Sequence, residues 1–231
     1  VRLGIIGFGI RGEQLCRALG FASNAWLKDM SDALKDNPKD TRLADFKAQE
    51  NLNIQLAAIC DIFDFRAEKA LESFNTATNK IKRFKTHQEL LTSGEVDAVV
   101  IPTPPHWHAP IAMAALNAGV HVYVEKPMTH SISETYALRD TVLKNPKLVF
   151  ALGHQHRQTQ SFLTAQDVIK KNILGHVSLI QTNTNRNDDN GAWQYEIHEK
   201  ASPETIDWNQ FIGNAPQEPF NLEHFFRWRK W

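Results

Sequence analysis

Residues 1–153 alternate between runs of hydrophobic residues and stretches with helical periodicity. Near-continuous apolar runs, typical of strands that are covered on both faces, lie at 2–6, 55–60, 97–101, 120–124 and 148–152. Apolar positions spaced three and four apart predict helices, most clearly at 65–74, 107–118 and 132–144. This alternation predicts an α/β fold with a doubly wound parallel sheet.

Residues 23–53 interrupt the alternation. They are polar and charged, and Pro38 separates two short helical patterns at 25–35 and 41–50. We interpret the segment as a surface insertion between the first helix and the second strand. A plain elaboration of the surface is favoured over a partner-binding or substrate-covering role.

The pattern changes after Gly153. An amphipathic helix is predicted at 159–173, with Phe162, Val168 and Ile169 as core candidates, and a strand at 177–186. The chain is polar, aromatic and loop-like from residue 187 onward. Because a single added strand would leave an open edge, residues 154–231 are predicted to be the start of a second, truncated domain.

Composition excludes several classes of protein. The chain has 26 Lys and Arg against 26 Asp and Glu, and its basic residues do not cluster, so no nucleic-acid partner is expected. No apolar run approaches the ~20 residues of a membrane helix, so no membrane partner is expected either. Cys16 and Cys60 sit among apolar neighbours and are predicted to be small buried residues.

Three glycines follow the first strand at the spacing of a dinucleotide-binding turn. Gly7, Gly9 and Gly12 fit G-x-G-x-x-G, and a helix is predicted from Glu13 to Leu19. Glycines there allow a tight turn and bring the helix amino terminus close to a pyrophosphate. The predicted cofactor-binding loop also includes Phe8, Ile10 and Arg11.

An acidic residue ends the second strand, as this motif requires. Asp61 follows the run 56–60, and the insertion explains why it lies further from the glycines than the usual ~20 residues. We favour a ribose-binding role over a helix cap. Because a carboxylate would repel a 2′-phosphate, NAD is preferred over NADP, although the nearby Arg66 weakens that preference.

Two further loops follow strands and carry polar groups. Thr103, His106 and His108 lie among prolines after 97–101 and are predicted to contact the cofactor. No third ligand with matching spacing suggests a metal site. After the last strand of the first domain, His154 and Arg157 are candidates for hydrogen bonding to a hydroxylated substrate.

Lys126 lies directly after the strand 120–124, in Glu125-Lys126-Pro127. A residue before proline is held extended, which aims the amine at the edge of the sheet where ligands bind. Burial there would lower its pKa toward the range in which a general base works.

Together these motifs resemble the Gfo/Idh/MocA oxidoreductase family over nearly the whole chain. The matching pieces are 4–12, Cys60-Asp61, Thr103-Pro104-Pro105-His106-Trp107-His108, Val122-Tyr123-Val124-Glu125-Lys126-Pro127, 206–216 and Arg227-Trp228-Arg229-Lys230. The resemblance implies a Rossmann domain that binds NAD(P), followed by a domain with an open, mostly antiparallel sheet that usually forms homo-oligomers.

The resemblance also implies roles for individual residues. Thr103, Pro104 and His106 would line the nicotinamide side, Glu125 would contact the neighbouring ribose, and Lys126 would contact the reacting hydroxyl of a sugar or cyclitol. Relatives carry a catalytic His, often with an Asp, beyond the region where this chain stops. We therefore do not expect the 231 residues of this chain to catalyse the reaction on their own.

Three functions stay open at this stage. The first is an NAD-dependent dehydrogenase acting on a carbohydrate or cyclitol hydroxyl, the second an NAD-dependent glycoside hydrolase, and the third a non-catalytic nucleotide-binding fragment. The cytoplasm is the expected location. A leader removed before Val1 would instead indicate the periplasm.

Overall fold

The structure is a computed structural model, and it describes residues 1–183 and 191–230. It divides into two compact units, of which the first contains residues 1–152 and 198–220, and the second 153–197 and 221–231. Among the described residues, no helix is long and apolar enough to cross a bilayer.

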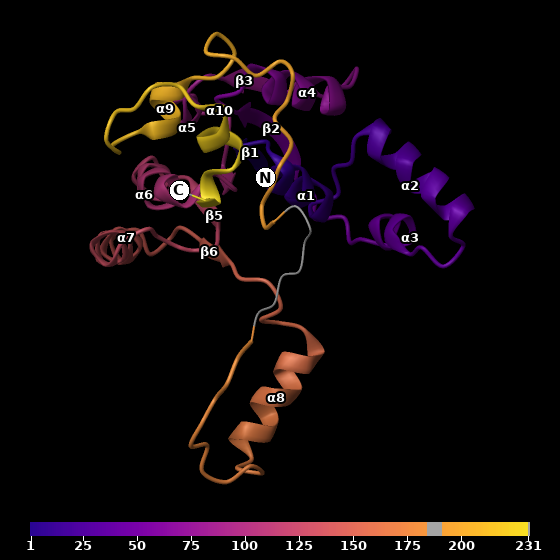
Figure 1. The fold of residues 1–231 in the computed structure, drawn as a ribbon, viewed down its shortest axis with the longest axis vertical. Coiled ribbons are helices and arrows are strands. Elements are labelled where there is room, and N and C mark those ends of the chain that lie inside the picture. The colour runs from indigo at the N-terminus through magenta and orange to yellow at the C-terminus, as the bar shows by residue number, and fades with distance from the viewer. Residues whose placement is uncertain (184–190, 231) are drawn as a thin grey trace. The chain divides into compact units, whose positions relative to one another are not determined.

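A six-stranded sheet forms the centre of the first unit (Figure 1), with the order β3-β2-β1-β4-β5-β6. The strands are β1 (Arg2–Ile6), β2 (Gln55–Cys60), β3 (Lys82–Phe84), β4 (Ala98–Ile101), β5 (His121–Glu125) and β6 (Phe150–Gly153). β1 pairs in parallel with β2 on one side and with β4 on the other. The predicted doubly wound parallel sheet is thereby confirmed, with the change of direction between β1 and β4.

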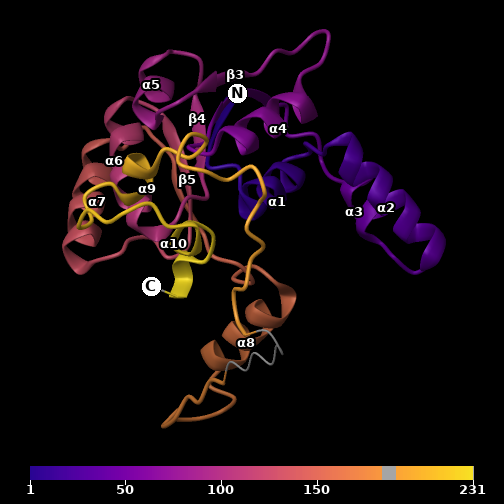
Figure 2. The ribbon, with the colours of Figure 1, turned by 45° about the horizontal axis from the view of Figure 1, so that its top comes forward.

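Helices cover both faces of the sheet (Figure 2). One face carries α1 (Ile10–Ala18) and α4 (Asp64–Phe74), and the other carries α5 (His87–Thr92), α6 (His108–Asn117) and α7 (Ile132–Lys144). The side chains of successive residues in a strand pack into the hydrophobic cores on opposite faces of the sheet. In β1, Ile5 packs with Leu15 and Ala67, whereas Ile6 packs with the cluster that contains Leu116. Double coverage explains why most strands are almost continuously hydrophobic.

The strand β3 and the helix α5 were not predicted from the sequence, and the loop-like character predicted after residue 187 is wrong at α9 (Trp208–Ile212) and α10 (Leu222–Phe226). β3 is only 3 residues long, too short for a clear pattern. α5 is 6 residues long, but it begins with a capping box in which Thr86 accepts from Glu89 N, and the Glu89 side chain accepts from the Thr86 backbone. That Thr-x-x-Glu signal was present in the sequence.

The insertion forms two helices beside α1, as Figures 1 and 2 show. α2 (Asn24–Asp36) and α3 (Arg42–Lys47) confirm the two predicted helical patterns. The rings of Trp26 and Phe46 meet edge to face at 5.4 Å, and the guanidinium of Arg17 lies 5.3 Å from the centre of the Trp26 ring. The aromatic pair thus joins α2 to α3, and the cation–π contact attaches the insertion to α1.

A segment late in the chain returns to the first unit; we call residues 198–213 the return segment. Ile206 forms an antiparallel bridge with Phe63, and backbone hydrogen bonds join Asp64 N to Thr205 O and Asp207 N to Ile62 O, each at 2.9 Å. The segment ends in α9 (Trp208–Ile212), whose Phe211 and Ile212 are buried. The predicted division at residue 153 stays a prediction, but residues 198–220 pack with the Rossmann sheet.

The second unit contains α8 (Gln160–Lys170), α10 (Leu222–Phe226) and the 3-10 helix η2 (Trp228–Lys230). Phe162 and Ile169 are 59% and 57% exposed, so the core predicted for α8 is not formed by the described residues. Residues 177–183 form no strand, and the predicted strand at 177–186 is wrong there because no neighbouring strand pairs with it. Residues 184–186 of that prediction lie outside the described residues.

We expect Gly213→Ala to destabilise the first unit. A Cβ at Gly213 would lie 2.6 Å from Trp107 Cζ2, and the residue has a φ of +61°. Gly94→Ala is the matched control, because Gly94 has a φ of +72° with nothing within 4 Å. Chemical denaturation should show a loss for Gly213→Ala about 1–3 kcal/mol greater than for the control. Equal losses would mean that the Trp107 contact is not tight.

Candidate functional site

The carboxyl ends of parallel strands meet at one edge of the sheet, and the loops after β1, β2, β4 and β5 carry most of the predicted site residues. In the loop after β1, Gly7 has a φ of +102°, and its N–H donates to Cys60 O at 2.8 Å. A Cβ at Gly12 would lie 2.3 Å from Gly7 O. Only glycine fits this turn, and α1 begins at Ile10, within the motif and earlier than predicted.

Asp61 is buried beneath the glycine turn. Its Oδ2 accepts from Phe8 N at 2.5 Å, and its Oδ1 accepts from Phe63 N at 2.8 Å. Burial raises the pKa of Asp61, and the positive charge of Arg66 and the two N–H groups act in the opposite direction. A carboxylate has about four acceptor positions, so Asp61 can tie the two loops together and still accept from ribose hydroxyls.

Arg66 lies over the glycine turn. A Cβ at Gly9 would be 3.5 Å from Arg66 Nη1. The guanidinium also lies 5.6 Å from the centre of the Phe63 ring. The structure therefore brings Arg66 close to the predicted pyrophosphate loop, and its predicted effect on the choice between NAD and NADP stays a prediction.

An ion pair joins the first turn of α1 to the end of β5. Arg11 Nη2 and Nε lie 2.6 Å and 2.8 Å from Glu125 Oε1. Glu125 is only 4% exposed, and its Oε2 accepts from Lys126 N at 3.3 Å. Both residues were predicted to contact the cofactor, but their pairing with each other was not. Because the carboxylate is buried, removing Arg11 would leave it uncompensated.

Lys126 is exposed in this structure, so the burial expected from the preceding strand is not observed. The Lys126–Pro127 peptide bond is cis.

On the neighbouring loop, Thr103 Oγ1 is buried and has no hydrogen-bond partner among the described residues. A buried hydroxyl without a partner is costly in a finished site, and it marks a place where a ligand group fits.

The histidines of the loop after β4 contact protein carbonyls. His106 Nε2 lies 2.7 Å from Phe211 O, which also accepts from Trp107 Nε1 at 3.1 Å. His108 lies between Thr103 O and Pro127 O, at 2.7 Å and 2.6 Å. Burial lowers the pKa of both histidines. Their ring nitrogens are thus engaged within the chain, and the predicted contacts of His106, His108 and Pro104 with a cofactor stay predictions.

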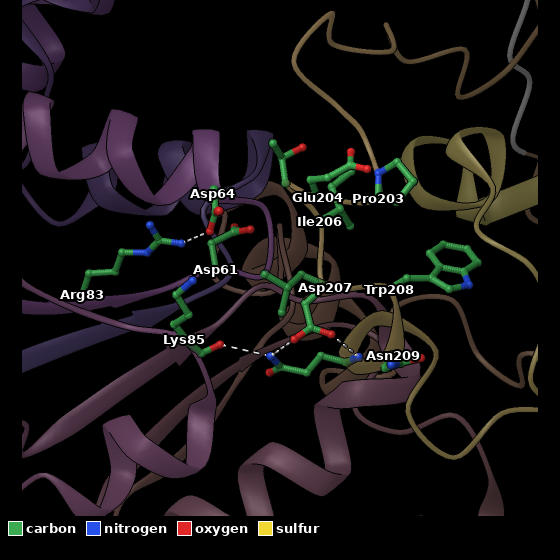
Figure 3. A pocket seen from close by; sticks show the side chains of 13 residues that line it. Asp61, Asp64, Arg83, Lys85, Pro203, Glu204, Ile206, Asp207, Trp208 and Asn209 are labelled. Carbon is green, nitrogen blue, oxygen red and sulfur yellow. Dashed lines mark hydrogen bonds and ion pairs between the residues drawn. The ribbon is translucent and has the colours of Figure 1, made fainter.

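A pocket of about 360 Å³ lies at the ends of β2 and β3, beneath the return segment (Figure 3). Asp61, Asp64, Arg83 and Lys85 line one side, and Pro203 to Gln210 line the other. Arg83 pairs with Asp64, and Gln210 Nε2 donates to Asp207 and to Lys85 O. This wall was not predicted from the sequence, although the family-like run at 206–216 is a usable signal for it.

His154 and Arg157, the predicted substrate contacts, belong to the second unit and are exposed. Their substrate roles stay predictions.

Across the part of the chain that the structure describes, no three His, Cys, Asp or Glu side chains gather as metal ligands. Cys16 and Cys60 are buried and unpaired, as predicted, and burial raises the pKa of the Cys16 thiol to about 12.

The residues at this edge fit a dinucleotide. The close approach of Gly12 to Gly7 O keeps the turn tight, as a dinucleotide-binding turn requires, and the amino terminus of α1 favours an anion. Asp61 lines the pocket, and Thr103 offers an unused buried hydroxyl. These groups follow three adjacent strands, β2, β1 and β4.

Comparison with known proteins agrees with this geometry. Residues 1–154 match the family model described as an oxidoreductase family with an NAD-binding Rossmann fold. The inositol 2-dehydrogenase of Salmonella typhimurium is 25% identical over 127 residues, which are 55% of this chain and 37% of that protein. Glycosyl hydrolase family 109 protein 1 of a Shewanella species is 28% identical over 186 residues, covering 77% and 33%.

Solved structures share the fold. The scyllo-inositol dehydrogenase of Lactobacillus casei with bound NAD(H) and scyllo-inositol has a TM-score of 0.55 at 20% identity, over 76% of this chain and 42% of that one. The chain spans less than half the length of each of these relatives. Because the family model covers most of the chain, the conclusion is direct: the chain belongs to the Gfo/Idh/MocA oxidoreductase family, with an NAD-binding Rossmann fold.

Proposed function

We propose that this chain is the cofactor-binding part of an NAD-dependent dehydrogenase that oxidises a hydroxyl of a carbohydrate or cyclitol. One observation carries the proposal: the glycine turn, Asp61, Thr103 and Lys126 follow neighbouring strands along one edge of the sheet. The inositol dehydrogenases among the relatives support the substrate class. Homo-oligomer formation and a cytoplasmic or periplasmic location stay predictions.

Different residues would bind different parts of the cofactor. Gly7, Gly9 and Gly12 would hold the pyrophosphate, and Asp61 the adenosine ribose. NAD is favoured over NADP, because the Asp61 carboxylate would repel a 2′-phosphate. Arg66 acts against that preference, since its guanidinium lies beside the same turn.

The chemistry needs an acceptor for hydride, which NAD supplies when bound. Lys126 would donate a hydrogen bond to the reacting hydroxyl and stabilise the negative charge that develops on its oxygen. Glu125 Oε2 accepts from Lys126 N, and Arg11 holds Glu125. The ion pair therefore fixes the backbone from which Lys126 extends, and fixed orientation contributes much of an enzymatic rate gain.

A second function has a specific observation in its favour. The match to the family 109 glycosyl hydrolase covers 77% of this chain, and so extends past the Rossmann domain. An NAD-dependent glycoside hydrolase would use the same cofactor residues, with oxidation and reduction of the sugar within one cycle.

Spectrophotometry on the whole protein separates the two functions. Net accumulation of NADH with inositols or free sugars is expected for the dehydrogenase. Release of the leaving group from aryl glycosides without net NADH formation would favour the hydrolase. NAD binding with neither reaction would contradict both and favour a non-catalytic nucleotide-binding protein.

Gly12→Ala should weaken NAD binding by this chain. The added Cβ would lie 2.3 Å from Gly7 O, so the turn must move away from the pyrophosphate position. Calorimetric titration should show affinity weaker by roughly tenfold or more, which corresponds to about 1.4 kcal/mol. Gly94→Ala, far from this turn in sequence and with open space around it, should bind NAD normally. Normal binding by Gly12→Ala would remove the glycine turn from the site.

Lys126→Met should separate binding from turnover. The side chain is exposed, so the variant is expected to fold and to bind NAD like the wild type. In the whole protein, kcat should fall by about 100-fold or more, in the range measured for general acid–base groups. Lys147→Met replaces another exposed lysine, near the opposite end of the sheet, and should keep full activity. Full turnover by Lys126→Met would contradict the catalytic role proposed for Lys126.

A further inference from the structure

His108 bridges two loops of the site through both nitrogens of its ring. It is the first residue of α6 and only 1% exposed. Nδ1 lies 2.6 Å from Pro127 O, and Nε2 lies 2.7 Å from Thr103 O. One imidazole thus joins the loop after β4 to the loop after β5.

The backbone of one loop makes no hydrogen bond to the backbone of the other in the described part of the chain. The ladder between β4 and β5 ends at the pair Ile101 and Val124. Beyond it, within residues 1–183 and 191–230, no backbone hydrogen bond joins residues 102–106 to residues 125–129. Thr103 carries the buried hydroxyl that has no partner, and Pro127 directly follows Lys126.

We propose that His108 is a positioning residue that clamps the Lys126 loop to the Thr103 loop, so that the reacting hydroxyl and the nicotinamide half of the cofactor meet in register. It acts through two carbonyl groups and does not touch the cofactor, in contrast to the direct contact predicted from the sequence. The chemical purpose of the clamp rests on the proposed function. The clamp itself is a property of this chain.

The protonation state of the His108 ring determines how many hydrogen bonds it makes to the two loops. A carbonyl oxygen only accepts, so the neutral ring makes one hydrogen bond and the imidazolium makes two. Burial lowers the pKa of His108, whereas the two carbonyls and the charge of Glu125 raise it, and Lys126 lowers it further. His106 lies on the same segment, and a positive charge on His108 lowers the pKa of His106. Ring nitrogen NMR shifts of His108 report which state is present.

Hydrogen exchange tests the clamp without any ligand. His108→Phe removes every hydrogen bond that the ring makes to the two loops, and His108→Gln keeps an amide donor and carries the test if the phenylalanine variant does not fold. Amide exchange at the non-proline residues of 102–106 and 125–129, which include Thr103, Lys126 and Met128, should become roughly tenfold faster in the phenylalanine variant. His121→Phe is the control, because His121 accepts from Val149 N at the opposite end of β5. It should leave both loops unchanged.

Ligand binding then separates positioning from general damage. NAD should bind roughly tenfold more weakly to the His108 variants. ADP-ribose lacks the nicotinamide, and its affinity should change by less than about twofold. His121→Phe should bind both ligands like the wild type.

Two results would overturn the clamp: unchanged exchange in both loops, or an equal loss of affinity for NAD and ADP-ribose. A wild-type chain that binds neither ligand would contradict the proposed function instead. In that case the exchange measurement still decides whether His108 holds the loops.

Discussion

The buried carboxylate of Asp61 determines the geometry of the whole carboxyl edge. Burial raises its pKa, and the backbone N–H groups of Phe8 and Phe63 compensate the buried oxygens. One side chain therefore sets the glycine turn after β1 against the loop after β2. The return segment depends on the same constraint, because Ile206 pairs with Phe63. A single satisfied acceptor thus orders three segments that are distant in sequence.

Much of the fold could be predicted from the sequence, because the strands are buried on both faces and read as apolar runs. β3 escaped prediction, since only Phe84 is strongly apolar among its 3 residues. The position of the return segment also escaped it. Its contacts join Thr205 to Asp64 and Phe211 to Trp107, and local patterns carry no information on such distant pairs.

For the candidate site, the sequence indicated which loops meet at one edge of the sheet, but not which side chains pair within them. The glycine spacing and the strand ends suffice to bring Asp61, Thr103 and Lys126 to one edge. What a polar side chain contacts there is decided by packing. Arg11 meets Glu125, and both nitrogens of His108 face backbone carbonyls. A motif marks such residues as important without saying whether they touch a ligand or hold the groups that do.

The insertion between α1 and β2 has a consequence for how this protein can diverge. β1 runs toward the ligand edge and α1 runs back, so α2 and α3 leave the fold at the opposite edge, where β2 begins. Changes in the length or charge of residues 23–53 therefore alter a surface that the dinucleotide edge does not share. Surface features can be added or lost there without moving the cofactor turn, because the insertion and the turn lie at opposite ends of the strands.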